Sequence, residues 1–202
     1  MTGFVARQPI VTADEEIYGY ELLYRASAEH DFFKEDPDTA TSDVALKSLS
    51  CIEPDTVTGR HTAFINFTEN SLLERLPHTL PASKITVEIL ENIKGSDEMV
   101  RILNELKHSG YQIALDDFVL DSTNEVFLSF ADIIKVDWQH SSAANMERIL
   151  EVQRHYDFIL LAEKLESAAE FKEAESIGCS LFQGYYFGCP QLMECPAYKE
   201  RR

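Results

Sequence analysis

Cysteine is scarce in this chain, and its spacing excludes the common zinc motifs. The 202 residues include four cysteines, Cys51, Cys179, Cys189 and Cys195. None of them forms a CxxC pair, and no histidine follows at the spacing of a zinc finger. We therefore interpret them as reduced thiols and expect a cytoplasmic protein.

Positive charge and long hydrophobic runs are also in short supply. Lysine and arginine total 18 against 35 aspartates and glutamates, which gives a formal net charge of −17. Such a chain lacks the basic face that grips nucleic acid polymers or docks on anionic membranes, so we expect neither partner. No apolar run approaches the roughly 20 residues of a membrane span. The opening MTGFVAR has no charged region followed by an apolar one, so we expect no secretory signal.

What the sequence does contain is a regular alternation of strand-like and helix-like segments. Hydrophobic residues make up 45% of the chain, which is enough for a sizeable core. Apolar runs predict strands at Phe4–Val11, Ile17–Tyr24, Ala63–Phe67, Ile85–Leu90, Gln112–Leu115, Ile133–Asp137, Phe158–Ala162 and Cys179–Phe182. Helices are predicted at Ser42–Ser50, Ser96–Ser109, Ala143–His155 and Ser167–Ile177, and a loop at His30–Thr41.

The order of these segments predicts a closed barrel. Only Thr12–Glu16 separates the first two strands, which is too short for a crossover helix, so they should form an antiparallel hairpin. From Ala63 onward strands and helices alternate, which implies a parallel sheet covered by helices. About eight strands favour an α/β fold of the TIM-like (βα)8 barrel type, with an early antiparallel strand. Because such barrels usually have about 200 residues or more, we expect somewhat abbreviated helices.

Polar residues stand near the C-terminal ends of the predicted strands. The C-terminal ends of all barrel strands open into one mouth, so these residues should meet although they are far apart in sequence. The set consists of Glu21, Asn66, Glu88, Asp116, Asp117, Lys135, Glu163 and Gln183. Carboxylate and amide oxygens suit Mg²⁺ or Mn²⁺, and the carboxylates exceed what one ion needs, so two ions fit the set. Lys135 adds a fixed positive charge, and we interpret Asp137 as a helix cap or as an ion-pair partner of Lys135.

These residues belong to a series of motifs that resembles the EAL-domain family, the cyclic di-GMP phosphodiesterases. QPI at Gln8–Ile10 and YELLYR at Tyr20–Arg25 are similar to the opening of that family, with Glu21-Leu22-Leu23 in place of Glu-Ala-Leu. FINFT, VEILE, LDDF, IKVD, AEKLE and FQGYYFGCP follow in family order, as far as Pro190. The resemblance implies a (βα)8-type barrel domain at residues 1–193, followed by a tail or the start of a linker at 194–202.

By position, the resemblance also implies a role for each site residue. One Mg²⁺ or Mn²⁺ ion would be held by Glu21, Asn66, Glu88 and Asp116, and a second by Asp116, Asp117 and Glu163. Lys135 would contact the attacking water, and the catalytic set would be Lys135, Glu21, Asp116 and Glu163. The dinucleotide would be bound by Gln8, Arg25, Gln183 and Pro190, and the loop after the Asp-Asp pair would be anchored by Glu91 and Glu166.

Two departures from the family pattern bear on activity. The family reads Asp-Asp-Phe-Gly-(Thr/Ala)-Gly, whereas Val119 and Asp121 replace both glycines, which reach backbone conformations that valine does not reach cheaply. Lys164 replaces the glycine of Glu-Gly-Val-Glu, and we expect its ammonium to pair with Glu163 and to compete with a metal ion. These changes favour a degenerate EAL domain that binds cyclic di-GMP and signals, with weak or no hydrolysis.

The sequence leaves alternatives open. One is an active Mg²⁺- or Mn²⁺-dependent phosphodiesterase that hydrolyses cyclic di-GMP to linear 5′-phosphorylated GpG, and another is a different metal-assisted barrel enzyme, of enolase or aldolase type. The opening FVARQPI and Leu22 resemble a subfamily in which the barrel precedes an HDOD domain. We therefore expect an HDOD or other output domain as a partner, and the family's two-fold dimers add a homodimer as a further option.

Overall fold

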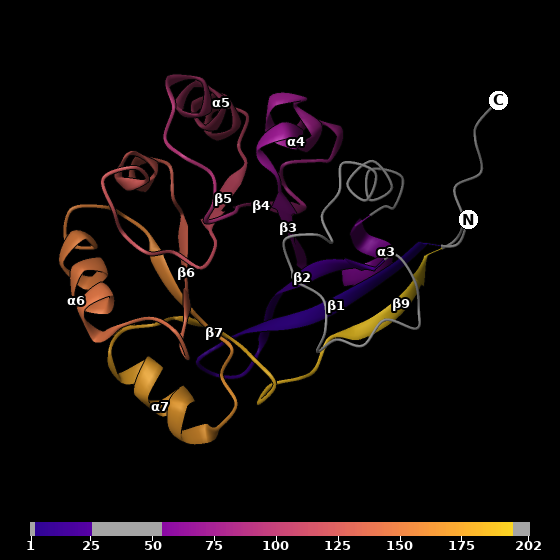
Figure 1. Ribbon diagram of the computed structural model, residues 1–202. Coiled ribbons are helices and arrows are strands. Elements are labelled where there is room, and N and C mark those ends of the chain that lie inside the picture. The colour runs from indigo at the N-terminus through magenta and orange to yellow at the C-terminus, as the bar shows by residue number, and fades with distance from the viewer. Residues whose placement is uncertain (1–2, 26–53, 196–202) are drawn as a thin grey trace.

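A computed structural model describes residues 3–25 and 54–195 as a closed barrel of eight strands with a ninth strand at one side (Figure 1). The order around the sheet is β2-β3-β4-β5-β6-β7-β8-β1, and β1 also pairs with β2, which closes the barrel. The predicted (βα)8-type barrel is thereby confirmed. The helix predicted at Ser42–Ser50 and the loop at His30–Thr41 lie outside the described residues.

The eight barrel strands fall where the hydrophobic runs predict them. They are β1 Gly3–Thr12, β2 Ile17–Arg25, β3 Thr62–Phe67, β4 Ile85–Ile89, β5 Gln112–Leu115, β6 Ile133–Asp137, β7 Ile159–Glu163 and β8 Leu181–Gln183. Each strand from β2 to β8 is parallel to the next, whereas β1 is antiparallel to both β2 and β8. The early hairpin predicted from the short connection is confirmed, and β1 is the one strand of the closed barrel that runs antiparallel to its neighbours within the described part of the chain.

Short helices cover the outside of the strands, as the chain length predicts (Figure 1). They are α3 Pro54–Thr58, α4 Glu69–Leu73, α5 Asp97–His108, α6 Ala143–Val152 and α7 Ala168–Ser176, with 3-10 turns η1 Leu76–Thr79 and η2 Glu125–Ser129. Between β5 and β6 the connection is reduced to η2. The barrel is thus abbreviated chiefly in its helices.

Local sequence explains where the three longest helices begin. Ser96 caps α5, because its side chain accepts a hydrogen bond from the Met99 N–H. Ser142 caps α6 in the same way. At α7 the predicted capping box is present, since Ser167 and Glu170 each accept from the other's backbone N–H. Such caps satisfy backbone donors that the helix itself leaves free, and they fix the ends of the loops that carry the strand-end residues.

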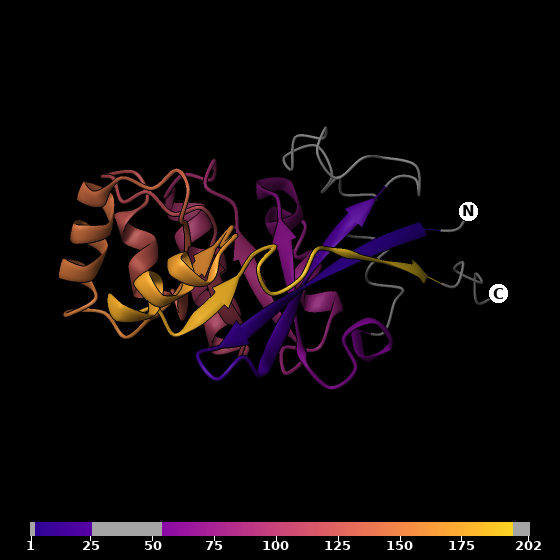
Figure 2. The ribbon, with the colours of Figure 1, turned by 90° about the horizontal axis from the view of Figure 1, so that it is seen from below.

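A ninth strand, β9 Gln191–Cys195, was not predicted from the sequence. It pairs antiparallel with the first half of β1, from Gly3 to Arg7, while β8 pairs with Ile10–Thr12. Gln8 and Pro9 therefore lie between the two pairings, opposite the segment that joins β8 to β9. Figure 2 shows β1, β2 and β9 extending beyond the part of the barrel that the helices cover.

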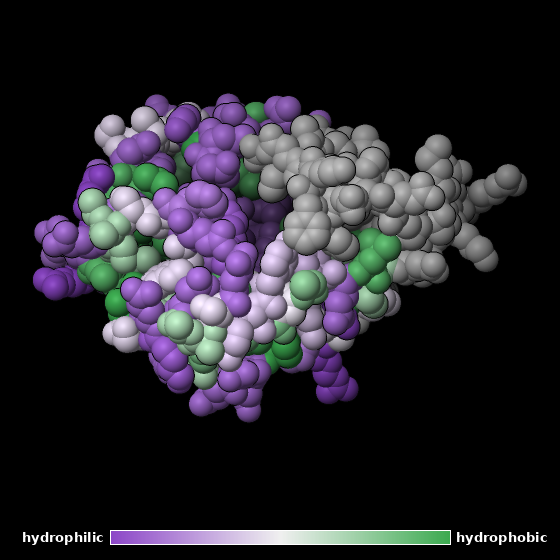
Figure 3. Space-filling model, turned by 60° about the horizontal axis from the view of Figure 1, so that its bottom comes forward, coloured by the Kyte–Doolittle hydropathy of each residue, from purple (hydrophilic) through white to green (hydrophobic). Residues whose placement is uncertain are grey.

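No described helix is long and apolar enough to cross a bilayer. Hydrophilic residues predominate on the face shown in Figure 3, and the hydrophobic residues there form separate patches. This distribution agrees with the strongly acidic composition.

Candidate functional site

The barrel interior consists of an apolar layer with a polar layer above it, at the C-terminal ends of the parallel strands. The lower layer contains a buried cluster of Ile10, Phe64, Ala114, Ile133, Leu161 and Leu181. Because side chains of a strand alternate between its two faces, the residue two positions further toward the mouth points inward as well. Those residues are Gln8, Asn66, Asp116, Lys135, Glu163 and Gln183, and by the same step Gly19 and Thr86 lead to Glu21 and Glu88. Each strand thus contributes one polar side chain to a common ring.

Lys135 lies at the centre of this ring. Its Nζ is 2.6 Å from Glu88 Oε1 and 2.6 Å from Asp116 Oδ1. It is also 2.9 Å from Glu163 Oε1 and 3.8 Å from Glu21 Oε2. The strands that carry these residues are β6 for the lysine and β4, β5, β7 and β2 for the carboxylates. The structure therefore brings together residues that are up to 142 positions apart in sequence, between Glu21 and Glu163.

Burial and charge act against each other within this cluster. Burial raises the pKa of the Glu88 carboxyl well above its usual range, and the charge of Lys135 opposes this rise. The pKa of Glu163 is raised for the same reason, with Lys135 again opposing. Burial alone would lower the pKa of Lys135, but the surrounding carboxylates, Asp116 first, outweigh it and raise the pKa. The lysine therefore stays charged and supplies the positive charge that the acids require.

A second group of hydrogen bonds connects Glu21 to the antiparallel side of the barrel. Gln183 Nε2 donates to Glu21 Oε2 at 2.6 Å and to Gln8 Oε1 at 3.2 Å. Asn66 Nδ2 donates to Glu21 Oε1 at 3.1 Å, so both carboxylate oxygens of Glu21 are held. Gln8 Nε2 in turn donates to the carbonyl of Gly188 at 3.2 Å, which attaches the segment after β8 to the mouth.

The oxygen atoms of this mouth suit a hard divalent cation. Asn66 Oδ1, Glu88 Oε2 and Gln183 Oε1 are buried and accept no hydrogen bond. A buried acceptor without a partner is costly, and a bound cation would satisfy it. The described residues contain no group of three or more histidines, cysteines or acids that is already spaced around a common metal position. The acids instead surround Lys135, so a cation would have to share them with its ammonium.

Lys164 contacts a different pair of acids from the one expected. Its Nζ lies 3.2 and 3.1 Å from the two carboxylate oxygens of Asp117 and 2.5 Å from Asp137 Oδ2. The expectation that Lys164 pairs with Glu163 is therefore wrong, because the side chain points across to the end of β6. Asp137 caps a turn and not a helix, since its Oδ1 accepts from the backbone N–H groups of Gln139 and His140, whereas Ser142 caps α6. The ion-pair partner of Asp137 is Lys164 and not Lys135.

The loop after Asp117 is held by two asparagines that sequence reasoning missed. Asn145, at the start of α6, donates to the Phe118 carbonyl at 3.1 Å and accepts from the Leu120 N–H at 3.1 Å. Asn124 donates to the Val119 carbonyl at 2.8 Å. Both asparagines are buried, and their partners become apparent only once the loop and α6 are placed together. The loop is thus fixed without the glycines found in the family pattern.

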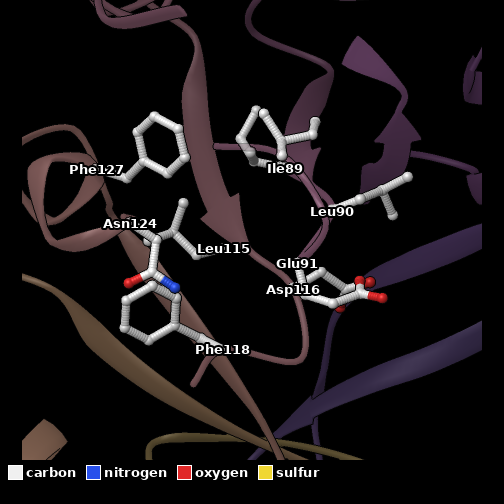
Figure 4. Close-up of a pocket in the computed structure, with 9 residues that line it drawn as sticks. Ile89, Leu90, Glu91, Leu115, Asp116, Phe118, Asn124 and Phe127 are labelled. Atoms are coloured by element: carbon white, nitrogen blue, oxygen red, sulfur yellow. The ribbon is translucent and has the colours of Figure 1, made fainter. Parts of the chain in front are cut away.

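A small pocket lies between the ends of β4 and β5, where residues of this loop and Asp116 of the mouth both line it (Figure 4). Asp116 and Glu91 lie at its polar end, and the rest of the lining is mainly apolar, including Leu115, Phe118 and Phe127. Glu91 is exposed and stands beside Asp116, and it lines the same pocket as the loop residues Phe118 and Asn124. Glu166, the other expected loop anchor, is exposed, and its backbone N–H donates to Glu170.

Two expected dinucleotide ligands stand at the rim. Arg25 is the last residue of β2, and its side chain lies outside the described part of the structure. Pro190 is half-buried and immediately precedes β9. Gly188, two residues before it, lies against Pro9 and accepts the bond from Gln8. The segment that ends at Pro190 is therefore attached to the same side of the mouth as Gln183.

This chain is similar to proteins of one family. The EAL domain family matches residues 3–190. The chain is 36% identical over 198 residues to the uncharacterized protein YuxH of Bacillus subtilis, which is 96% of this chain and 48% of YuxH. It is 37% identical over 200 residues to the cyclic di-GMP phosphodiesterase CdgJ of Vibrio cholerae, which is 96% of this chain and 45% of CdgJ. The chain thus spans about half the length of these curated relatives.

A solved structure gives the same fold. Klebsiella pneumoniae BlrP1, in its complex with calcium and cyclic di-GMP, superposes with a TM-score of 0.71 at 22% sequence identity. The superposition covers 95% of this chain and 57% of the BlrP1 chain. The fold of this chain is therefore shared with BlrP1.

Proposed function

This chain belongs to the EAL-domain family, and we propose that it binds cyclic di-GMP together with a divalent cation, as a signalling domain with weak or no hydrolysis. The observation that carries the proposal is the ring of strand-end residues around Lys135, with acceptors of Asn66, Glu88 and Gln183 left without a donor. CdgJ, at 37% identity, is named as a cyclic di-GMP phosphodiesterase, and BlrP1 holds the dinucleotide with calcium. We infer the class of ligand, a cyclic dinucleotide, from these two proteins.

We assign a role in binding to each side chain of the ring. Glu21, Asn66, Glu88 and Asp116 would hold a Mg²⁺ or Mn²⁺ ion, which when bound supplies charge that stabilises a phosphodiester under attack by water. Gln183 and Asn66 keep both oxygens of Glu21 in place. Lys135 remains an ammonium because of the acids around it, and it can orient a water or balance charge on a phosphate. We assign the rim residues Gln8, Arg25 and Pro190 to the dinucleotide.

The alternative is an active phosphodiesterase, and the presence of Glu163, Asp116 and Lys135 in one cluster favours it. In that case water would attack one phosphorus of cyclic di-GMP and the bond from that phosphorus to the 3′ oxygen would break. The product would be linear GpG with a 5′-phosphate and a free 3′-hydroxyl. The ion pair between Lys164 and Asp117 is the observation that favours binding over turnover.

A two-part experiment distinguishes binding of cyclic di-GMP from its hydrolysis. Calorimetry with cyclic di-GMP in Ca²⁺ should give a 1:1 complex for the wild-type chain, and GMP should give none. Glu88→Gln should weaken the complex at least tenfold, whereas Glu147→Gln, on the exposed side of α6, should not. Incubation with Mn²⁺ and cyclic di-GMP then measures the linear product. Binding without multiple turnovers supports the proposal, rapid turnover supports the alternative, and no binding heat at micromolar protein rejects both.

We extend the proposal to partners of the domain. An HDOD or other output domain would read the bound state, and a homodimer would pair two barrels. The support is the resemblance of FVARQPI to the subfamily with an HDOD domain and the coverage of about half of the relatives' length. Light scattering of the chain with and without cyclic di-GMP tests the dimer, since a monomer under both conditions contradicts it.

A further inference from the structure

Lys164 connects the ends of three neighbouring strands through one ammonium group. The residue follows β7, and its Nζ contacts Asp117 after β5 and Asp137 at the end of β6. Both oxygens of Asp117 are engaged, at 3.2 and 3.1 Å. The Lys164 carbonyl is also held, because Gln139 Nε2 donates to it at 3.2 Å. A single cationic atom thus gathers two carboxylates from two strands, which is the arrangement a metal ion would otherwise require.

The backbone is adapted to this contact. Lys164 has a φ of 59° and Asp117 a φ of 40°, both in the left-handed region that residues other than glycine rarely adopt. A strained conformation persists only where the surroundings determine it. The two left-handed residues are the two partners of the ion pair. The surrounding fold thus fixes the backbone at both ends of this contact.

We propose that the Lys164 ammonium takes the place of a second divalent cation, so that this chain holds one metal ion where the Asp117 carboxylate would otherwise help to hold two. The inference rests on the proposed function, because it concerns the cation that accompanies the dinucleotide. Asp117 belongs to the expected ligand set of the second ion with Asp116 and Glu163. Asp117 forms its ion pair with Lys164, whereas Asp116 and Glu163 form theirs with Lys135.

Two acids balance the charge of Lys164. Its Nζ donates to both carboxylate oxygens of Asp117 and to Asp137 Oδ2. A second cation would have to displace this ammonium from Asp117 while lying close to it. Like charges at short distance repel, and more strongly where water is partly excluded. The expected result is loss of the second site, with the first site at Glu21, Asn66, Glu88 and Asp116 retained.

The test is the number of Mn²⁺ ions bound per chain, measured by equilibrium dialysis and by electron paramagnetic resonance with cyclic di-GMP present. The variants are Lys164→Gly and Lys164→Asn, which remove the charge and both suit a left-handed backbone. Lys164→Arg keeps the charge. Lys172→Gln is the matched control, because Lys172 is an exposed lysine on α7 whose partner Glu175 lies outside the site. Circular dichroism verifies that each variant folds.

We expect one Mn²⁺ for the wild-type chain, Lys164→Arg and Lys172→Gln, and two for Lys164→Gly and Lys164→Asn. In the latter two, magnetic coupling between neighbouring ions should broaden the six-line Mn²⁺ spectrum. Two ions on the wild-type chain would overturn the inference, as would one ion on both uncharged variants. A wild-type chain that binds cyclic di-GMP but no Mn²⁺ would instead contradict the cation in the proposed function, so the two failures are distinguishable.

Discussion

The ammonium nitrogen of Lys135 lies 2.6 Å from Glu88 Oε1, and neither side chain exposes more than 1% of its surface. Removing one partner of such a pair leaves a buried charge without compensation, which costs far more than an exposed pair contributes. Glu163 and Asp116 depend on the same nitrogen, at 2.9 and 2.6 Å. The stability of the mouth therefore depends on one lysine.

Replacing that lysine should destabilise the protein strongly. For Lys135→Met we expect the free energy of unfolding at pH 7 to fall by about 3–5 kcal/mol, the usual cost of breaking a buried pair. Urea titration followed by the fluorescence of Trp138, the single tryptophan, gives this number. The loss should be smaller at pH 5, because burial raises the pKa of Glu88 and the acid can become neutral.

The control for this variant is Lys172→Met, which removes an exposed lysine of α7. It should change the free energy of unfolding by less than about 0.5 kcal/mol. If Lys135→Met were as stable as this control, the acids would not depend on Lys135 for their charge balance.

The predicted cation site in the mouth can be tested by removing its carboxylate ligands. Glu21→Ala and Asp116→Ala should each lower the affinity for Mn²⁺ at least tenfold and abolish any hydrolysis of cyclic di-GMP, because each removes a hard oxygen ligand. Isothermal titration with Mn²⁺ measures the affinity, with Glu147→Ala as an exposed control. Hydrolysis that survived both site variants would show that the cation is held elsewhere.

The pair of Asp137 with Lys164 predicts a pH dependence. Burial would raise the pKa of Asp137, but hydrogen bonds from Lys164 and His140 outweigh it and hold the pKa below its ordinary value. A carboxyl with a lowered pKa in the folded state stabilises the protein above the pKa of the unfolded chain, about 3.9. This stabilisation is lost as the pH falls through the lower, folded-state pKa.

Asp137→Asn should therefore cost about 1.5–3 kcal/mol at pH 6, a size typical of a hydrogen bond to a charged group. The difference from the wild-type chain should shrink between pH 4 and pH 3. Urea titrations at several pH values measure it, and Asp157→Asn, at an exposed position before β7, should show no such trend. A difference that stayed constant with pH would mean that Asp137 is not held as a carboxylate.

The sequence was sufficient to predict the barrel and most of the ring of polar side chains. Both follow from the alternation of inward- and outward-facing residues along the strands. Strand alternation places Glu21, Asn66, Asp116 and Gln183 on the inward face once the apolar layer below them is known. β9 was missed because its sequence, QLMEC, alternates weakly and its pairing with β1 depends on contacts far along the chain.

The partner of Lys164 could not be derived from sequence either. A lysine next to Glu163 suggests a pair between neighbours, but successive residues of a strand point to opposite faces, and the left-handed backbone at Lys164 redirects its side chain to Asp137. The same limit applies to Asn145, whose hydrogen bonds to the loop require the position of α6 relative to β5.

The loop after Asp117 offers a competing explanation of the weak hydrolysis that we propose. Val119 and Asp121 replace the glycines of the family pattern, yet neither has a left-handed φ. Asp121 Oδ1 instead accepts from the backbone N–H groups of Thr123 at 2.6 Å and Asn124 at 3.2 Å. The loop therefore has a conformation of its own that does not require glycine.

Restoring both glycines tests this explanation against the one based on Lys164. We expect the double variant Val119→Gly/Asp121→Gly to have a lower Tm and unchanged hydrolysis, because glycine adds freedom to the unfolded chain and the Asp121 hydrogen bonds are lost. Lys164→Gly should raise hydrolysis severalfold, because it frees Asp117 for a cation. Linear product formed in Mn²⁺ is the measurement, with Lys172→Gln as the control. A rise in the double variant without one in Lys164→Gly would place the defect in the loop, since only the loop would then have limited turnover.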